Sequence, residues 1–219
     1  MLKENFRISD TYKVTLAAIG QEELELKEGF AIPEIVSSIL SVSKDHVYSL
    51  SQKHTDIAFE APFEGEKRGD ALYSFQKNSY LVIKTADCVP IFFWSKQKPC
   101  VGIAHSGWKG TKQNIIHKTL SLTGLDLESF EFYIGPCIRK DSYEVQLDVI
   151  SEFQNYKNCY YQTDRGYMLG IDEIIKEQIF SFSKTAKILD SKVCTLKEKK
   201  FYSHRRKDLG RNLNIIYFE

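Results

Sequence analysis

Three short, uninterrupted apolar runs in the middle of the chain restrict the fold more than any other feature. They are Leu81–Ile83, Ile91–Trp94 and Val101–Ala104. Short continuous runs of this kind are typical of strands that are buried on both faces. Such strands need apolar layers above and below them, and 42% apolar residues in a chain of 219 can supply those layers.

Apolar residues at helical spacing surround these runs and predict four helices. They are Pro33 with Ile35, Ile39 and Leu40; Ile115, Ile116 and Leu120; Tyr143, Leu147, Ile150 and Phe153; and Ile171, Ile174, Ile175, Ile179 and Phe182. The first has proline in its opening turn, where its missing N–H costs nothing. The second is expected to end at Gly124, a suitable C-cap residue.

Further strands are predicted at both ends of the chain and after the second helix. The segments are Tyr12–Ala18, Phe130–Ile134 and the alternating Leu213, Ile215 and Tyr217. Strands and helices therefore alternate, which indicates an α/β protein. Because no linker-like stretch divides the chain, we expect residues 1–219 to form a single domain.

Charge and cysteine content limit the partners and the compartment. Thirty basic residues are balanced by 29 acidic ones, so the chain as a whole offers no electrostatic reason to bind nucleic acid or an anionic membrane. The first residues carry charges where a signal peptide needs an apolar run, and no run approaches the length of a membrane span. An odd number of cysteines, five, argues against a disulfide framework. We expect a cytoplasmic protein with free thiols.

Three segments place reactive side chains beside the apolar runs, where α/β proteins tend to hold their sites. They are Ser51–His54, Thr85–Pro90 and Ala104–Gly110. His54, Cys88 and His105 from these segments make a competent zinc set that leaves the fourth tetrahedral position open. Their separations of 34 and 17 residues are no signature, however. On the residues alone, a core thiol with two hydrogen-bonded histidines is favoured over the zinc site.

Several short motifs follow one another along the chain: His54 after glutamine and lysine, Asp70-Ala71-Leu72, Thr85-Ala86-Asp87-Cys88 with Pro90, His105-Ser106-Gly107-Trp108-Lys109-Gly110, Ile134-Gly135-Pro136-Cys137-Ile138 with Tyr143-Glu144-Val145, Cys194-Thr195, and Phe201–Arg206 with Gly210-Arg211. In this order they resemble the laccase-domain family, also called the YfiH-like polyphenol oxidase or purine nucleoside phosphorylase family. The resemblance covers most of the chain. Departures are Lys53, Ser106, Lys109 and His204, and none of them removes a metal ligand.

This resemblance implies both a fold and a function. It implies a layered α/β sandwich with mixed sheets, related to cysteine-hydrolase-like folds. It implies zinc on His54, Cys88 and His105, with copper less expected. The implied activities are phosphorolysis of adenosine, inosine and methylthioadenosine to free base and (methylthio)ribose 1-phosphate, together with adenosine deamination. The implied partners are purine nucleosides and inorganic phosphate, for a monomer or weak homodimer.

Other residues have an alternative role beside a functional one. Arg205, Arg206 and Arg211 are expected to seat phosphate, since a guanidinium binds it through two parallel hydrogen bonds; the alternative is a solvated basic turn. Asp87 either orients a ligand histidine or caps a turn. Trp108 either stacks on a base or anchors the core. Packing or surface roles are expected for the remaining histidines and cysteines, which include His46, His117, Cys100, Cys137, Cys159 and Cys194.

Three other functions compete with the nucleoside enzyme. The first is a metal-free cysteine hydrolase or amidase with Cys88 as nucleophile and His105 or His54 as base. The second is copper-dependent phenol oxidation, which the five histidines are too few to support in a multicopper enzyme. The third is a binding protein with structural zinc, which requires a fourth protein ligand.

Overall fold

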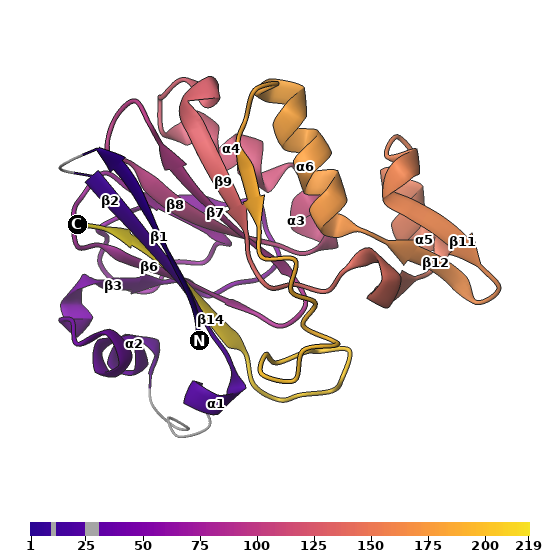
Figure 1. Ribbon diagram of the computed structural model, residues 1–219, viewed down its shortest axis with the longest axis horizontal. Helices are drawn as coiled ribbons and strands as arrows, with labels where there is room; N and C mark the ends of the chain where they lie inside the picture. Colours follow the sequence, from indigo (N-terminus) through magenta and orange to yellow (C-terminus); the bar gives the residue numbers. More distant parts are fainter. Residues whose placement is uncertain (10–11, 25–30) are drawn as a thin grey trace.

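The computed structural model describes residues 1–9, 12–24 and 31–219, in which two large sheets are stacked between helices (Figure 1). The first sheet contains β1 (Leu2–Ser9), β2 (Tyr12–Ile19), β14 (Asn212–Phe218), β6 (Tyr80–Thr85) and β3 (Val47–Ser49), in this order. The second contains β13 (Ile188–Asp190), β9 (Phe130–Ile134), β7 (Val89–Ser95), β8 (Val101–Ser106), β5 (Ala71–Ser74) and β4 (Ala58–Ala61). Both sheets mix parallel and antiparallel pairs, as expected.

Helices cover the outer faces of the two sheets. On the first sheet lies α2 (Ile32–Leu40), and on the second lie α3 (Trp108–Lys112), α4 (Ile115–Leu122) and α6 (Ile171–Phe182). Shorter elements are α1 (Gln21–Leu24), α5 (Leu147–Ile150) and the 3-10 helices η2 (Lys44–His46), η3 (Leu127–Ser129), η4 (Lys140–Ser142), η5 (Ser151–Phe153) and η6 (Lys157–Cys159). The order of layers is therefore helix, sheet, sheet, helix. This confirms the predicted layered α/β fold with mixed sheets.

Alternating side chains explain why the apolar runs are continuous. In β6, Leu81 and Ile83 pack between the two sheets, while Val82 packs toward α2. In β7, Phe92 packs between the sheets and Phe93 toward the helices. Each such side chain stabilises the fold by about 1.5–3 kcal/mol when fully buried. Strands that lie between two apolar layers need apolar residues at every position, so the predicted burial on both faces is confirmed.

A third sheet projects to one side of the sandwich, at the right of Figure 1. It contains β10 (Glu144–Val145), β12 (Gly166–Leu169) and β11 (Tyr160–Thr163). The predicted single helix through residues 143–153 is therefore wrong at its start, because Glu144 and Val145 pair with β12. Leu147, one member of the helical stripe, has 63% of its surface exposed. The stripe follows a strand, a short helix and a 3-10 turn rather than one helix.

The other predicted helices are confirmed with small shifts. The stripe from Ile171 to Phe182 matches α6 at both ends. Pro33 lies in the first turn of α2, and Gly124 follows the end of α4 with φ +68°, a conformation that favours glycine. Strand β1 was not predicted from the sequence, because polar residues interrupt its apolar ones. No helix in the described ranges has the length and apolar character needed to cross a membrane.

Candidate metal centre

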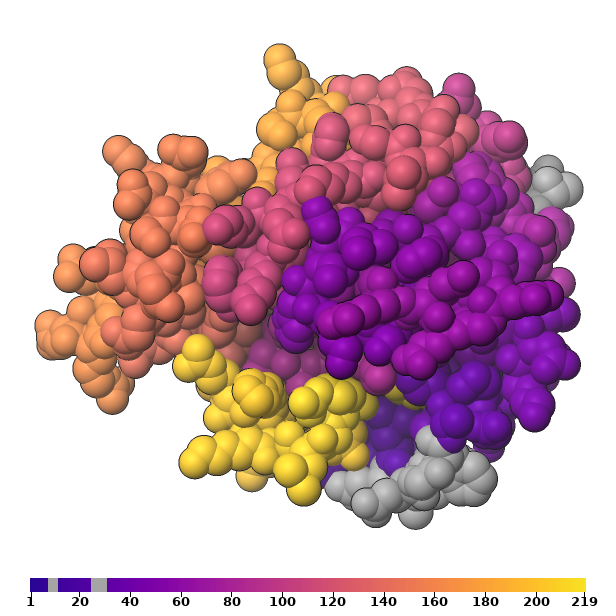
Figure 2. Space-filling view, turned by 180° about the vertical axis from the view of Figure 1, so that it is seen from behind, coloured from indigo at the N-terminus to yellow at the C-terminus, as the bar shows by residue number. Residues whose placement is uncertain are grey.

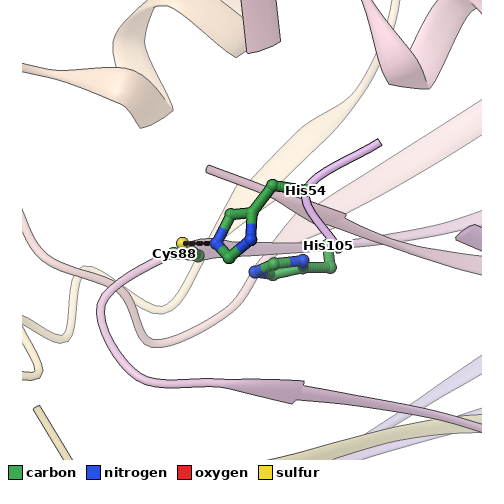
Figure 3. A group of neighbouring side chains, drawn as sticks. All are labelled: His54, Cys88 and His105. Carbon is green, nitrogen blue, oxygen red and sulfur yellow. Dashed lines mark hydrogen bonds between the residues drawn. The ribbon is translucent and has the colours of Figure 1, made fainter. Parts of the chain in front are cut away.

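His54, Cys88 and His105 converge where the two sheets meet. His54 lies on the loop after β3, Cys88 lies on the link between β6 of the first sheet and β7 of the second, and His105 lies on β8. One ligand atom from each side chain lies within 4.8 Å of the other two. The Cys88 Sγ is 3.8 Å from His54 Nε2, and the two imidazole rings are 4.8 Å apart between centroids. Figure 3 shows the three side chains directed toward one another.

Asp70 fixes the orientation of His105. Its Oδ1 is 2.8 Å from His105 Nδ1, and the carboxylate is fully buried directly before β5. Because an ionised carboxylate only accepts hydrogen bonds, Nδ1 carries the proton and Nε2 is left to bind a metal. The sequence contained this residue only as part of the Asp70-Ala71-Leu72 motif, and its function was not predicted from it.

The same carboxylate also fixes the loop that carries His54. It accepts hydrogen bonds from the backbone N–H groups of Lys53, His54 and Thr55, and from the Thr55 hydroxyl. Burial alone would raise the pKa of Asp70, but His105 and the Thr55 donors lower it to about 2. One buried side chain therefore positions two of the three candidate ligands.

The half-buried Cys88 and the buried His105 stabilise each other in their charged forms. Burial alone would raise the pKa of the Cys88 thiol, but the two imidazoles, His105 most strongly, hold it well below its usual value. Burial would lower the pKa of His105, whereas Cys88 and Asp70 raise it. The site therefore favours a thiolate, which is the form of cysteine that binds a metal or acts as a nucleophile.

Two histidines and one cysteine are a donor set that suits a tetrahedral metal ion with one open position. Donors at zinc–nitrogen and zinc–sulfur bond lengths lie about 3.5 Å apart in tetrahedral geometry, close to the 3.8 Å between Cys88 Sγ and His54 Nε2, while the three donor atoms together lie within 4.8 Å. Gly107 borders the same space, since a Cβ there would lie 2.8 Å from Cys88 Sγ and 3.1 Å from His54 Cδ2. Any side chain at residue 107 would therefore displace Cys88 or His54.

The number of donors argues against two of the alternatives. Within residues 1–9, 12–24 and 31–219, this is the one cluster of three or more histidine, cysteine or carboxylate donors close enough to hold a metal. It has three members, whereas a structural zinc site takes four protein ligands. The other histidines, His46, His117 and His204, lie outside it, so a multicopper centre lacks its donors here.

A cavity of about 880 Å³ opens beside the cluster. Its wall includes His54 and Cys88, residues 106–109 at the start of α3, and residues 204–211 near the C-terminus. The remaining lining residues are Lys53, Ala86, Asp87, Val89, Ile138, Tyr143 and Ile171, with Arg206 and Gly210 absent from the C-terminal part. Figure 2 shows the C-terminal segment, in yellow, beside the projecting segment, in orange, with a hollow between them.

The three predicted arginines have different positions. Arg205 and Arg211 line the cavity with exposed side chains, and Arg205 lies 4.9 Å from the centre of the Tyr143 ring. Arg206 is turned away from the cavity. Its guanidinium donates to the carbonyls of Thr195, Leu196 and Phe201 and to the Asp208 carboxylate, and so binds the loop together.

Asp87 connects the cysteine link to this C-terminal loop. Its carboxylate accepts hydrogen bonds from Thr195 Oγ1 at 2.6 Å, Ser203 Oγ at 3.1 Å and the Arg205 N–H at 2.7 Å. The orienting role that the sequence offered for Asp87 therefore belongs to Asp70, and Asp87 fixes the loop instead.

Trp108 combines features of its two predicted roles, base stacking and core packing. It lines the cavity and also packs against the apolar layer under α3, α4 and α6. Cys100, Cys137 and Cys159 are buried core residues, as expected, and Cys194 is half-buried outside the cavity wall. His117 contacts the Phe182 ring on the helical face, and His204 lines the cavity with an exposed side chain.

Comparison with known proteins agrees with the motifs. A purine nucleoside phosphorylase of Haemophilus influenzae is 28% identical over 98% of this chain and 87% of its own length. One from Borreliella burgdorferi is 34% identical over 77% of both chains. The crystal structure of a Neisseria meningitidis protein matches the fold with a TM-score of 0.84, over 100% of this chain and 98% of its own, at 20% identity. The model of the multi-copper polyphenol oxidoreductase laccase family matches residues 32–219, so the chain belongs to this family.

Proposed function

We propose that this protein is a zinc-dependent purine nucleoside phosphorylase. The observation that carries the proposal is the His54–Cys88–His105 cluster, which lies beside a cavity lined by Arg205 and Arg211. Relatives named purine nucleoside phosphorylase support the reaction. The substrates would be adenosine, inosine and methylthioadenosine with inorganic phosphate. The products would be the free base and (methylthio)ribose 1-phosphate.

The cavity residues have distinct tasks in this reaction. Arg205 and Arg211 hold the phosphate oxygens, since guanidinium groups match them in geometry and charge. Arg206 is left out, because its donors are already used by the loop. Trp108 and Tyr143 supply aromatic surfaces against which a purine packs. Zinc, when bound to the cluster, supplies a Lewis acid at its open position.

Phosphate attacks the anomeric carbon of the ribose while the bond to the purine nitrogen breaks. The sugar passes through a state with oxocarbenium character, as in glycoside cleavage. The negative charge of the held phosphate stabilises this cationic sugar. The purine leaves with the electron pair of the broken bond and takes up a proton.

The finer part of the proposal is adenosine deamination in the same cavity. It is supported by the family resemblance and by a zinc-competent cluster. The His-x-Glu and Pro-Cys-x-x-Cys signature of the zinc nucleobase deaminases is absent from the sequence. Deamination would therefore use a different proton donor from those enzymes.

One experiment separates these activities. The purified protein is incubated with adenosine and with inosine, with and without phosphate, and products are followed chromatographically beside metal analysis. Phosphorolysis is expected to release free base only with phosphate, and deamination to form inosine from adenosine without it. If a zinc-loaded sample forms neither product, the proposal fails.

A metal-free cysteine hydrolase or amidase is the second candidate. Its support is the chain of contacts from Cys88 through His105 to Asp70, an arrangement of nucleophile, base and orienting carboxylate. Chelation separates the two candidates. A zinc enzyme loses activity with a strong chelator and regains it with zinc, whereas the hydrolase is indifferent to chelation and blocked by thiol alkylation.

A further inference from the structure

The cavity wall carries more positive charge than its own carboxylates neutralise. Its cationic residues with no carboxylate partner in the described part of the chain are Lys53, Lys109, Arg205, Lys207 and Arg211. Two carboxylates also line it. Asp87 is used by the loop hydrogen bonds, and Asp208 is paired with Arg206. In a chain of 30 basic and 29 acidic residues, this excess is local to the cavity.

Phosphorolysis of a neutral nucleoside explains only part of this charge. Inorganic phosphate near neutral pH carries between one and two negative charges, and two guanidinium groups suffice to bind it. Unpaired like charges around one cavity repel each other, so keeping them together costs free energy in the empty protein. A second anionic group on the substrate would offset that cost.

Lys53 and Lys109 lie on a different part of the wall from the arginines. Lys53 directly precedes His54, and its backbone N–H donates to Asp70. Lys109 lies on α3, with its Nζ 5.5 Å from the centre of the Trp108 ring. Both lysines are exposed and line the same cavity as His54 and Cys88. The C-terminal loop carries the other cations.

We propose that the cavity acts on purine nucleoside monophosphates, with the phosphate of the nucleotide on Lys53 and Lys109. Inorganic phosphate then lies on Arg205 and Arg211, and the purine lies near Trp108. This inference rests on the proposed phosphorolysis and specifies its substrate class. A cavity of about 880 Å³ is toward the upper end of small-molecule sites, about 300–1,000 Å³, and has room for a nucleotide beside phosphate.

The reaction balances without a further reactant. The bond between the anomeric carbon and the purine nitrogen breaks, and its electron pair stays on the purine. An oxygen of hydrogen phosphate forms the new bond to the anomeric carbon, and its proton passes to the purine. With adenosine 5′-monophosphate the products are adenine and ribose 1,5-bisphosphate.

The test compares adenosine 5′-monophosphate with adenosine on zinc-loaded protein with phosphate. The Lys53→Gln/Lys109→Gln double variant removes both charges and keeps polar side chains. We expect it to lower the ratio of kcat/KM for the nucleotide to that for the nucleoside about 100-fold, since each lost charged hydrogen bond weakens binding about 10-fold or more. Lys112→Gln is the matched control, because Lys112 lies on the same helix outside the cavity, 2.7 Å from Glu152.

Calorimetry of the two ligands gives a second readout. Adenosine 5′-monophosphate is expected to bind at least 10-fold more tightly than adenosine to the wild type and the Lys112→Gln variant, but not to the double variant. The inference is overturned if adenosine is cleaved while the nucleotide is neither cleaved nor bound, and phosphorolysis then still stands. It is also overturned if the double variant weakens both substrates equally. If neither substrate is cleaved, the proposed phosphorolysis fails. The calorimetric comparison of wild type and double variant then decides whether Lys53 and Lys109 bind the nucleotide phosphate.

Discussion

The metal cluster and the C-terminal loop face the same cavity but are held by different forces. His105 is 4% exposed on β8, and its partner Asp70 is fully buried beside it. Arg205 and Arg211, by contrast, are exposed on the segment between Ser203 and Asn212, and the described residues give this segment no helix or strand. Packing between layers fixes the first group. A few hydrogen bonds to carboxylates fix the second.

The loop depends mainly on Asp87 and Asp208. Asp87 accepts bonds from the side chains of Thr195 and Ser203 and from the backbone of Arg205. Asp208 accepts from the Ser203 N–H and pairs with Arg206. Under the proposed function, a rigid wall would hold the metal, while the phosphate would be bound by a segment that few hydrogen bonds fix.

Cys88→Ala is expected to have the largest effect, because it removes one of the three proposed metal ligands. Loss of residues that merely orient a ligand costs about 10–100-fold in metal affinity or activity, so loss of the thiolate should exceed about 100-fold. Bound zinc and turnover are measured together. Cys194→Ala, at a half-buried cysteine outside the cavity, is the control. Unchanged zinc content and turnover in Cys88→Ala would show that His54, Cys88 and His105 do not form the metal site.

Asp70→Asn comes next, since it keeps the shape of the side chain but loses its charge. Metal affinity should fall about 10–100-fold, because His105 loses the partner that fixes its proton on Nδ1. Competition with a chromogenic chelator measures the change. Asp56→Asn is the control, as Asp56 lies two residues after His54 and pairs with Lys118 at the surface. Equal affinities in both variants would show that the carboxylate does not orient the ligand.

The neighbouring arginines test the loop. Arg205→Gln should raise KM for phosphate about 10-fold or more, with little change in stability, because its side chain is exposed toward the cavity. Arg206→Gln should instead lower the free energy of unfolding by about 1–3 kcal/mol, because three carbonyls and Asp208 lose their donor. Phosphate kinetics and denaturant unfolding of both variants decide this. The reverse pattern would assign the phosphate to Arg206.

Low pH should have the smallest effect: it should weaken the C-terminal loop before it weakens the strands around the metal cluster. Burial raises the pKa of Asp208, but the Ser203 N–H and Arg206 lower it below its usual value. A carboxylate with a lowered folded pKa stabilises the fold above its unfolded pKa of about 3.9 and loses this contribution as pH falls further. Asp70, with a pKa of about 2, stays ionised to lower pH.

Hydrogen exchange of the metal-free protein at pH 3 measures this separation. Residues 203–211 should lose protection severalfold more than residues 101–106, after correction for intrinsic exchange rates. Simultaneous loss of protection in both segments would mean that the loop and the strands unfold as one unit. The metal cluster and the C-terminal loop would then differ in position but not in local stability.

The sequence predicted those strands and helices whose own burial produces a regular spacing of apolar residues. The runs of β6, β7 and β8 and the stripe of α6 are examples, since burial on both faces or on one helical face leaves a periodic signal. Strand β1 and the third sheet left no such signal. Their positions depend on pairing with segments distant in the chain, as Glu144 pairs with Met168.

The candidate site was predictable only in part, and for a related reason. The spacing of His54, Cys88 and His105 carries no information about their meeting, which depends on how two sheets are stacked. The motifs of the family supplied that information. The role of Asp70 and the turn of Arg206 away from the cavity depend on particular hydrogen bonds, and no residue pattern specifies these before the backbone is known.

The position of β14 has a consequence for the order of assembly. This strand, residues 212–218, lies between β2 and β6 and pairs with both, so the first sheet is interrupted until it arrives. During synthesis, residues 12–19 of β2 and residues 80–85 of β6 leave the ribosome long before residues 212–218 of β14. Both would expose unpaired edges throughout that interval. Nascent chains should therefore be most vulnerable to aggregation and proteolysis before residues 212–218 emerge, and deleting these residues should harm folding more than trimming surface loops.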